Sequence, residues 1–352
     1  MFININADGT FNNSIKLFKH LDKLSEWEKT GDTYPIMASI DLTNACNNFC
    51  PLCMGVRPDN NSIPYEKVKD IIMQLKDVGI KSIGLGGGGD PSVHPKINDI
   101  IRFIKSEGLE VGMYSNCYML SNKLMETMMD SLTYLRVSLD ADSPETYKIT
   151  HGMNEKAFYA VLDNIRKLIA LRRTMNKPIV IGAGYLVGPE TILGIYGATK
   201  LYKELGMDYI RIRPFFDMKP FTEEQINQIT EELKKSMELQ DDSFTVTSPT
   251  HRLDWMMKGN AERPYGKCYI HHFETVITAN QKLYPCCHLS GMEEYCYGDL
   301  RQNTFKEVWN SERRKQAYEN ITFKDCPNPC SLDGHNRMLW GLKEPVLHPN
   351  FL

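Results

Sequence analysis

The chain has 352 residues, of which 42% are hydrophobic and 24% are charged, with a formal net charge of −3. This composition suits one large globular domain with an appendage, or two domains that share an interface. The small net charge gives no reason to expect nucleic acid or an anionic membrane as a partner. No signal peptide and no membrane-spanning apolar run is visible, so ten cysteines predict metal or redox chemistry in the cytoplasm, not a disulfide framework.

A strand–helix unit repeats six times after a polar lead-in at residues 1–35. Predicted strands cover residues 36–42, 80–85, 109–115, 134–140, 179–187 and 209–213, and amphipathic helices separate them. Such alternation implies parallel strands with helices outside, and right-handed crossovers curl the strands into a barrel or three-quarter barrel. We therefore predict an α/β fold, a partial (βα)6 TIM-like barrel over residues 36–215.

The composition changes after the sixth strand. Residues 216–250 are expected to form a connector with an acidic amphipathic helix and a short strand. Residues 251–335 are rich in Cys, His and aromatic residues and hold six of the ten cysteines, which predicts a small Cys-rich C-terminal region. Residues 336–352 form a tail.

Three cysteines lie close together directly after the first predicted strand. Cys46, Cys50 and Cys53 have the spacing C-x3-C-x2-C, and grouped thiolates select zinc, copper(I) or iron–sulfur centres. A four-iron cluster held by three cysteines keeps one iron open for a substrate or cofactor, whereas structural zinc takes four closed ligands. A zinc site with a fourth, distant ligand remains the alternative.

Other polar and glycine-rich segments follow the later strands. The glycine loop at residues 86–91, Asn116, Asp140 and Glu190 all come directly after predicted strands. In parallel barrels the chemistry gathers at the carboxyl ends of the strands. We therefore predict that these segments and the cysteine loop share one site.

The combination of these motifs resembles the radical SAM superfamily through residues 36–214. The resemblance rests on the three cysteines, on Gly88-Gly-Asp-Pro91 and on Ser138-Leu-Asp140. It implies a [4Fe-4S] cluster whose open iron chelates S-adenosylmethionine (SAM), and a 5′-deoxyadenosyl radical that abstracts hydrogen from a substrate. It also implies a reductant such as flavodoxin or ferredoxin as partner.

The same resemblance assigns cofactor contacts. The loop at residues 88–91 is similar to the family's Gly-Gly-Glu-Pro loop, which meets the methionine ammonium group, although a flexible turn is the alternative. The polar residues after strands three and four could bind ribose or carboxylate or could cap loops, and the arginine could pair with a carboxylate or form an outward salt bridge. The candidate cofactor-binding residues are Gly88, Gly89, Asp90, Pro91, Asn116, Ser138, Asp140 and Arg213.

Four C-terminal cysteines form a second pattern. Cys268 and Cys286 flank a predicted hairpin, and Cys326 and Cys330 follow a helix. The arrangement resembles the SPASM/twitch extension of radical SAM enzymes, which implies one fully ligated auxiliary [4Fe-4S] cluster as electron acceptor or relay. The C-x3-C spacing of the last pair departs from the usual C-x2-C, and a four-cysteine zinc knuckle is the alternative.

Three cysteines are left without a ligand role, namely Cys117, Cys287 and Cys296. Each could donate a hydrogen atom to a substrate radical, and each could instead be a small apolar core residue. Cys117 stands where the family commonly has glycine after the corresponding asparagine.

The resemblance predicts a dehydrogenase or epimerase that acts on a carbohydrate or aminocyclitol-type small molecule. Oxidation would send the second electron to the auxiliary cluster, and epimerisation would return hydrogen from a cysteine. A peptide-modifying SPASM enzyme is the first alternative. An electron-transfer iron–sulfur protein without radical chemistry is the second.

Overall fold

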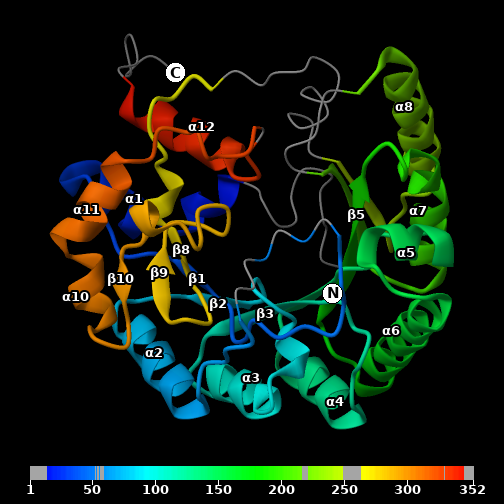
Figure 1. The fold of residues 1–352 in the computed structure, drawn as a ribbon, viewed down its shortest axis with the longest axis horizontal. Coiled ribbons are helices and arrows are strands. Elements are labelled where there is room, and N and C mark those ends of the chain that lie inside the picture. Colours follow the sequence, from blue (N-terminus) through cyan, green and yellow to red (C-terminus); the bar gives the residue numbers. More distant parts are fainter. Residues whose placement is uncertain are drawn as a thin grey trace.

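The computed structural model describes residues 14–51, 53, 55, 59–215, 221–248, 263–328 and 330–344. In this part of the chain, ten strands form one sheet in the order β10-β9-β8-β1-β2-β3-β4-β5-β6-β7 (Figure 1). The strands are β1 (Met37–Ile40), β2 (Ser82–Leu85), β3 (Glu110–Ser115), β4 (Tyr134–Val137), β5 (Val180–Val187), β6 (Tyr209–Pro214), β7 (Thr245–Thr247), β8 (Glu274–Ile277), β9 (Lys282–Tyr284) and β10 (Gly298–Asp299).

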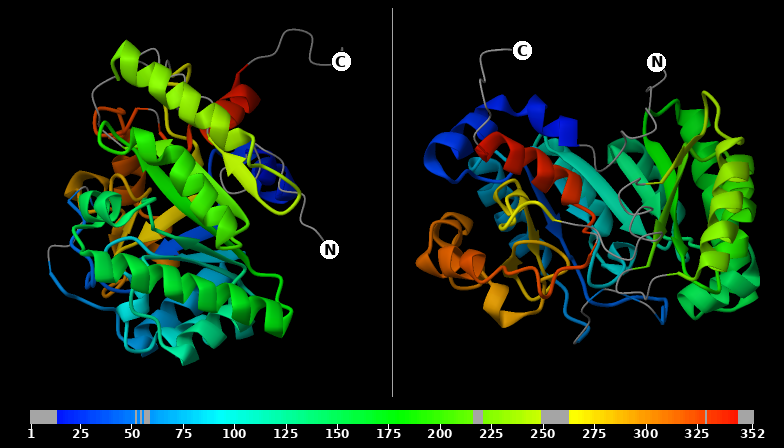
Figure 2. Two further views of the ribbon diagram at one scale, coloured as in Figure 1. Left: turned by 90° about the vertical axis from the view of Figure 1, so that its right-hand side faces the viewer. Right: turned by 90° about the horizontal axis from the view of Figure 1, so that it is seen from above.

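Helices connect the strands and surround the curved sheet (Figures 1 and 2). The α-helices are α1 (Leu21–Thr30), α2 (Tyr65–Asp77), α3 (Ile97–Ser106), α4 (Asn122–Ser131), α5 (Pro144–His151), α6 (Glu155–Met175), α7 (Ile195–Glu204), α8 (Glu223–Met237), α10 (Phe305–Trp309), α11 (Glu312–Glu319) and α12 (Asp333–Lys343). The 3-10 helices are η1 (Ser14–Lys19), η2 (Pro91–Val93), η3 (Ile192–Gly194), η4 (Ile270–His272) and η5 (Glu293–Tyr295). No helix among the described residues is long and apolar enough to cross a membrane.

Strands β1 to β6 pair in parallel and in sequence order, which confirms the expected α/β barrel-like fold. Two pairings were not foreseen. Strand β7, in the segment expected to be a connector, continues the sheet as a parallel neighbour of β6. Strand β8 pairs in parallel with β1, with Ile40 opposite Ile277, so the C-terminal hairpin extends the same sheet at its other end.

The two faces of the sheet differ in character. The face toward the helices is apolar, as shown by Val111 and Met113 of β3 and by Leu135 and Val137 of β4, all of which are fully buried in the main core. Since side chains alternate along a strand, the residues between them point to the opposite, inner face. Glycine leaves room for aromatic rings there: a Cβ at Gly112 would lie 2.2 Å from the ring of Tyr134.

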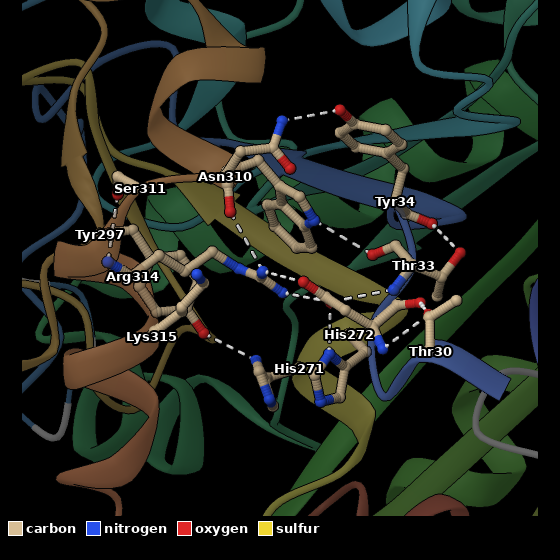
Figure 3. A network of polar contacts seen from close by, with 12 residues as sticks. Thr30, Thr33, Tyr34, His271, His272, Tyr297, Asn310, Ser311, Arg314 and Lys315 are labelled. Atoms are coloured by element: carbon tan, nitrogen blue, oxygen red, sulfur yellow. Dashed lines mark hydrogen bonds and ion pairs between the residues drawn. The ribbon is translucent and has the colours of Figure 1, made fainter. Parts of the chain in front are cut away.

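The N-terminal segment is tied to the C-terminal region (Figure 3). Asp32 accepts hydrogen bonds from both terminal nitrogens of Arg314, at 2.5 and 2.9 Å, and its Oδ1 lies 2.7 Å from His272 Nδ1. Trp309 Nε1 donates to the carbonyl oxygen of Thr33 at 3.1 Å. Part of the expected C-terminal tail, residues 345–352, lies outside the described residues, as do residues 249–262.

Candidate functional site

The cysteine loop leaves the end of β1 and leads to α2. Cys46 and Cys50 are half-buried, and Cys53 is exposed. Nitrogen donors approach two of the sulfur atoms: Asn116 Nδ2 lies 3.8 Å from Cys46 Sγ, and the Gly55 amide lies 3.4 Å from Cys53 Sγ. Hydrogen bonds to sulfur stabilise thiolates and tune iron–sulfur clusters. The surroundings of these thiols therefore fit cluster ligation.

The glycine loop after β2 packs directly against the cysteine loop. The Gly89 amide donates to the Thr43 carbonyl at 2.8 Å, and the Asp90 amide donates to the Ala45 carbonyl at 3.0 Å. A Cβ at Gly89 would lie 1.9 Å from the Ala45 oxygen, which no side chain can tolerate. These glycines are thus needed for the contact between the two loops, and they are not merely a flexible turn.

Asp90 connects this loop to the end of β3. Its carboxylate accepts hydrogen bonds from the Ser92 amide at 2.8 Å, the Asn116 amide at 2.6 Å and the Ser115 hydroxyl at 3.1 Å to both oxygens. Burial raises the pKa of Asp90, and these hydrogen bonds oppose the rise. A carboxylate has about four acceptor sites, and these contacts use most of them. A contact between Asp90 and the ammonium group of SAM stays a prediction.

Several buried polar atoms near the strand ends have no partner among the described residues. They include Asp140 Oδ1, after β4, and Arg213 Nε, in β6. Two more are Asn47 Nδ2 and Asn48 Oδ1, in the cysteine loop itself. A buried polar group without a hydrogen bond is costly, so such atoms indicate where a polar ligand binds. Their presence beside the cysteine loop fits SAM.

Pro91 is the first residue of η2, and the Ser138 amide donates to the Ser115 carbonyl at 2.8 Å. Asp90 thus joins the loop after β2 to the end of β3, and Ser138 lies beside the same end of β3. That these segments share one cofactor site stays a prediction.

Two acidic residues with raised pKa values were missed by the sequence reasoning. Asp41 lies at this end of the sheet, whereas Glu274 lies beside Met37, the first residue of β1. Asp41 directly follows β1, and burial raises its pKa to about 7, against a hydrogen bond from the Gly88 amide. Glu274 begins β8, and burial raises its pKa to about 7 as well. Asp41 could have been found, because it is a carboxylate at a predicted strand end. Glu274 could not, because its burial depends on the pairing of β8 with β1.

The three unassigned cysteines lie in different surroundings. Cys117 is fully buried in the main core with a φ of +56°, which explains why glycine suits this position. Cys296 is buried near β10, where its thiol lies 3.7 Å from the Gly298 carbonyl. Cys287 is exposed at the surface of the protein. Desolvation of its thiol by the surrounding protein, followed by the nearby charge of Glu274, raises its pKa to about 12. The structure does not bring the three together.

The four cysteines expected to hold an auxiliary cluster line one cavity. Cys268 comes before β8, Cys286 follows β9, and Cys326 and Cys330 lie between α11 and α12. The remaining wall is mostly apolar, with Leu289, Phe323 and Leu332 among its residues.

The chemistry of this cavity fits a metal cluster. Burial raises the pKa of all four thiols, and nearby cysteines contribute for Cys268, Cys286 and Cys330. Two nitrogen donors face sulfur, since Asn336 Nδ2 lies 3.8 Å from Cys268 Sγ and the Leu332 amide lies 3.4 Å from Cys330 Sγ. Metal binding deprotonates such thiols and stabilises the fold around them. Nowhere in the described chain do three His, Cys, Asp or Glu side chains converge on a single-ion site.

A partial barrel with a three-cysteine loop at its strand ends and a separate four-cysteine cavity defines an iron–sulfur enzyme of the radical SAM type. Family models agree: residues 40–184 match the radical SAM superfamily, and residues 268–332 match the SPASM iron–sulfur cluster-binding domain. The chain belongs to the radical SAM superfamily and carries a C-terminal SPASM domain. Its cofactors are accordingly a [4Fe-4S] cluster with SAM, and auxiliary iron–sulfur ligation in the SPASM domain.

Similar proteins span most of the chain. The tungsten-containing aldehyde ferredoxin oxidoreductase cofactor-modifying protein of Pyrococcus furiosus is 22% identical over 83% of this chain and 86% of its own length. The AdoMet-dependent heme synthase of Methanosarcina barkeri is 24% identical over 79% and 82%, respectively. Streptococcus suis SuiB, crystallised with SAM, has the same fold, with a TM-score of 0.66 at 14% identity over 86% of this chain and 72% of SuiB.

Proposed function

We propose that this protein is a radical SAM oxidoreductase or epimerase that removes a hydrogen atom from a carbohydrate or aminocyclitol-type small molecule. The observation that carries the proposal is the placement of one accessible thiol, Cys287, near Asp41, Glu274 and Arg213. Asp41 follows the carboxyl end of β1, Glu274 begins β8 opposite Met37, and Arg213 precedes the last residue of β6. Groups from three strands therefore act on this thiol.

Separate groups of residues hold the catalytic cluster, SAM and the auxiliary cluster. Cys46, Cys50 and Cys53 hold the catalytic cluster, and the loop at residues 88–91 with Asn116, Ser138 and Asp140 orients SAM. Together these cofactors supply a 5′-deoxyadenosyl radical when a reductant such as flavodoxin or ferredoxin provides one electron. Cys268, Cys286, Cys326 and Cys330 hold the auxiliary cluster, which supplies an electron acceptor.

Two outcomes follow from removal of the hydrogen atom. Loss of one further electron and one proton from the substrate radical gives an oxidised product. Alternatively, the Cys287 S–H bond breaks and a new C–H bond forms, which inverts the carbon centre. The thiyl radical left on Cys287 then needs one electron from the reductant and one proton from the solvent before the next turnover.

A peptide substrate is the second candidate. SuiB has also been crystallised with its precursor peptide SuiA, and this chain matches that structure with a TM-score of 0.68 over 92% of its length. At 14% identity the likeness concerns the fold, so a peptide substrate is a competing proposal to be tested beside the first.

The test is anaerobic reconstitution followed by reduction in the presence of SAM. Full loading should give about eight iron atoms per chain, and about four when Cys268 and Cys326 are replaced by alanine. 5′-Deoxyadenosine should form, and its absence at full loading would refute the radical mechanism. In deuterated water, deuterium at a substrate carbon indicates epimerisation; Cys287→Ala should abolish that incorporation, whereas Cys117→Ala and Cys296→Ala should retain it.

A further inference from the structure

The inner face of the sheet carries a group of arginine and tyrosine side chains. In β4, Arg136 lies between the core residues Leu135 and Val137, and in β6, Arg213 follows the core residue Ile212. Alternation along each strand therefore points both arginines to the inner face. The two positive charges repel each other. Burial is the largest effect that lowers the pKa of Arg213 to about 10, and the charge of Arg136 is the next.

Neither arginine has a carboxylate partner in the part of the chain that the structure describes. Of the ion pairs within 4.0 Å there, none involves Arg136 or Arg213. The Nε atom of Arg213 is buried without any hydrogen-bond partner. Asp140 is the acidic residue whose charge favours the Arg213 guanidinium, but one carboxylate cannot balance two guanidinium groups. The pair therefore lacks at least one negative charge.

The surroundings do not supply that charge. Asp41 and Glu274 have pKa values of about 7, so near neutral pH each carries only part of a charge. His335 of α12 also has positively charged neighbours. Burial, followed by the charges of Lys16 and Arg211, lowers its pKa to about 4. Both arginines are half-buried, and the Nε atom of Arg213 is buried without a partner. A buried polar group without a hydrogen bond is costly, so this group is expected to bind an anion.

Arg136 is held in position before any ligand arrives. Its guanidinium group lies over the ring of Tyr114, 4.1 Å from the ring centre. The Tyr134 hydroxyl donates to the Tyr114 hydroxyl at 2.8 Å, and the two rings meet edge to face at 5.7 Å. A side chain that is already ordered loses little conformational entropy on binding. The fold thus presents a rigid guanidinium group toward the inner space.

We propose that Arg136 and Arg213 bind a carboxylate or phosphate group of the substrate, which makes the substrate an anionic small molecule. Guanidinium groups match the planar, two-oxygen geometry of both groups. This inference rests on the proposed function and narrows it. A phosphorylated or carboxylated carbohydrate is favoured, and an aminocyclitol, whose amino groups are positively charged at neutral pH, is disfavoured.

The first experiment measures binding of inorganic phosphate to the reconstituted holoenzyme by ³¹P NMR titration. Saturable binding is expected for the wild type with SAM present. Arg136→Gln should weaken it at least tenfold and Arg136→Lys clearly less, because lysine keeps the charge. Arg301→Gln is the control, since Arg301 is 54% exposed and pairs with Asp299 on the surface; it should bind phosphate as the wild type does. Equal affinity in Arg136→Gln and wild type would overturn the proposal.

SAM also has a carboxylate, so the two sources of the anion must be separated. If SAM displaces phosphate competitively from the wild type, the arginine pair binds the SAM carboxylate and the proposal fails. In parallel, sugar phosphates and uronic acids should increase 5′-deoxyadenosine formation more than uncharged sugars or aminocyclitols do. Stimulation by aminocyclitols alone would overturn the anionic class while leaving the radical function intact. Absence of 5′-deoxyadenosine under all conditions would instead refute the proposed function.

Discussion

Replacing Asp32 should loosen the contact between the N-terminal segment and the C-terminal region. In the structure, Asp32 is the bidentate partner of Arg314, whose side chain is only 3% exposed and lies 3.7 Å above the ring of Trp309 (Figure 3). Asp32→Asn removes the negative charge and leaves the buried guanidinium with the Trp309 carbonyl as its other acceptor.

The magnitude follows from the burial of the two partners. Removing one member of a buried ion pair costs about 3–5 kcal/mol. Asp32 is 42% exposed, so water can enter beside the asparagine and reduce the loss. We expect Asp32→Asn to lower the free energy of unfolding by about 2–3 kcal/mol.

The assay is a double-mutant cycle with Asp32→Asn, Arg314→Met and the combined variant. Urea unfolding of the reconstituted protein is followed by circular dichroism and tryptophan fluorescence, and coincident transitions justify a single free energy. The combined variant leaves no unpaired charge, so it should lose less than the sum of the single variants, with a coupling energy above about 1.5 kcal/mol. Glu312 and Lys315 on the same helix form an exposed pair and serve as the control cycle, with coupling below about 0.5 kcal/mol. Equal coupling in the two cycles would refute the reasoning.

Three further predictions concern the two cysteine sites and the carboxylate of Glu274. Gly89→Ala should push apart the loops at Gly89 and Ala45 and reduce iron content to about four atoms per chain; full iron loading would contradict this. Asn336→Ala removes the donor to Cys268 and the acceptor for the Tyr269 and Ile270 amides, so it should destabilise the protein by about 2 kcal/mol. It should also shift the reduction potential of the auxiliary cluster in a redox titration monitored by electron paramagnetic resonance. An unchanged potential would count against a hydrogen bond from Asn336 to the sulfur of Cys268. Burial raises the pKa of Glu274 to about 7, so its stabilising contribution is complete below the unfolded-state pKa of about 4 and is lost as the pH rises through 7. Glu274→Gln should therefore be more stable than wild type by about 2 kcal/mol at pH 8, with a smaller difference at pH 5.5, and a difference independent of pH would contradict the burial argument.

The strand–helix repeat and the catalytic cysteine loop could be predicted because both depend on short-range pattern. Residues three or four apart along a helix share a face, and alternate residues along a strand do so too, so Val68, Ile71 and Ile72 indicate α2 without any tertiary information. The spacing of Cys46, Cys50 and Cys53 likewise holds three thiols together whatever the rest of the chain does.

The role of the glycine loop was only partly visible. The sequence left a family-like SAM loop and a flexible turn as alternatives for the glycines, and the structure shows that Gly89 contacts the backbone of Thr43 and Ala45. The resemblance to a family loop directed attention to SAM. Which backbone the loop contacts depends on the parallel pairing of β1 with β2, and that pairing is a long-range contact.

The sequence by itself therefore determined the repeating secondary structure, the metal-binding character of the cysteine loop and the family. Tertiary structure alone decided that β8 pairs with β1, that the four C-terminal cysteines line a single cavity, and that Arg136 and Arg213 act on each other across the inner face. The physical reason is that burial and charge compensation are properties of contacts between distant segments. A residue such as Glu274 acquires its raised pKa only when the surrounding chain excludes water from it.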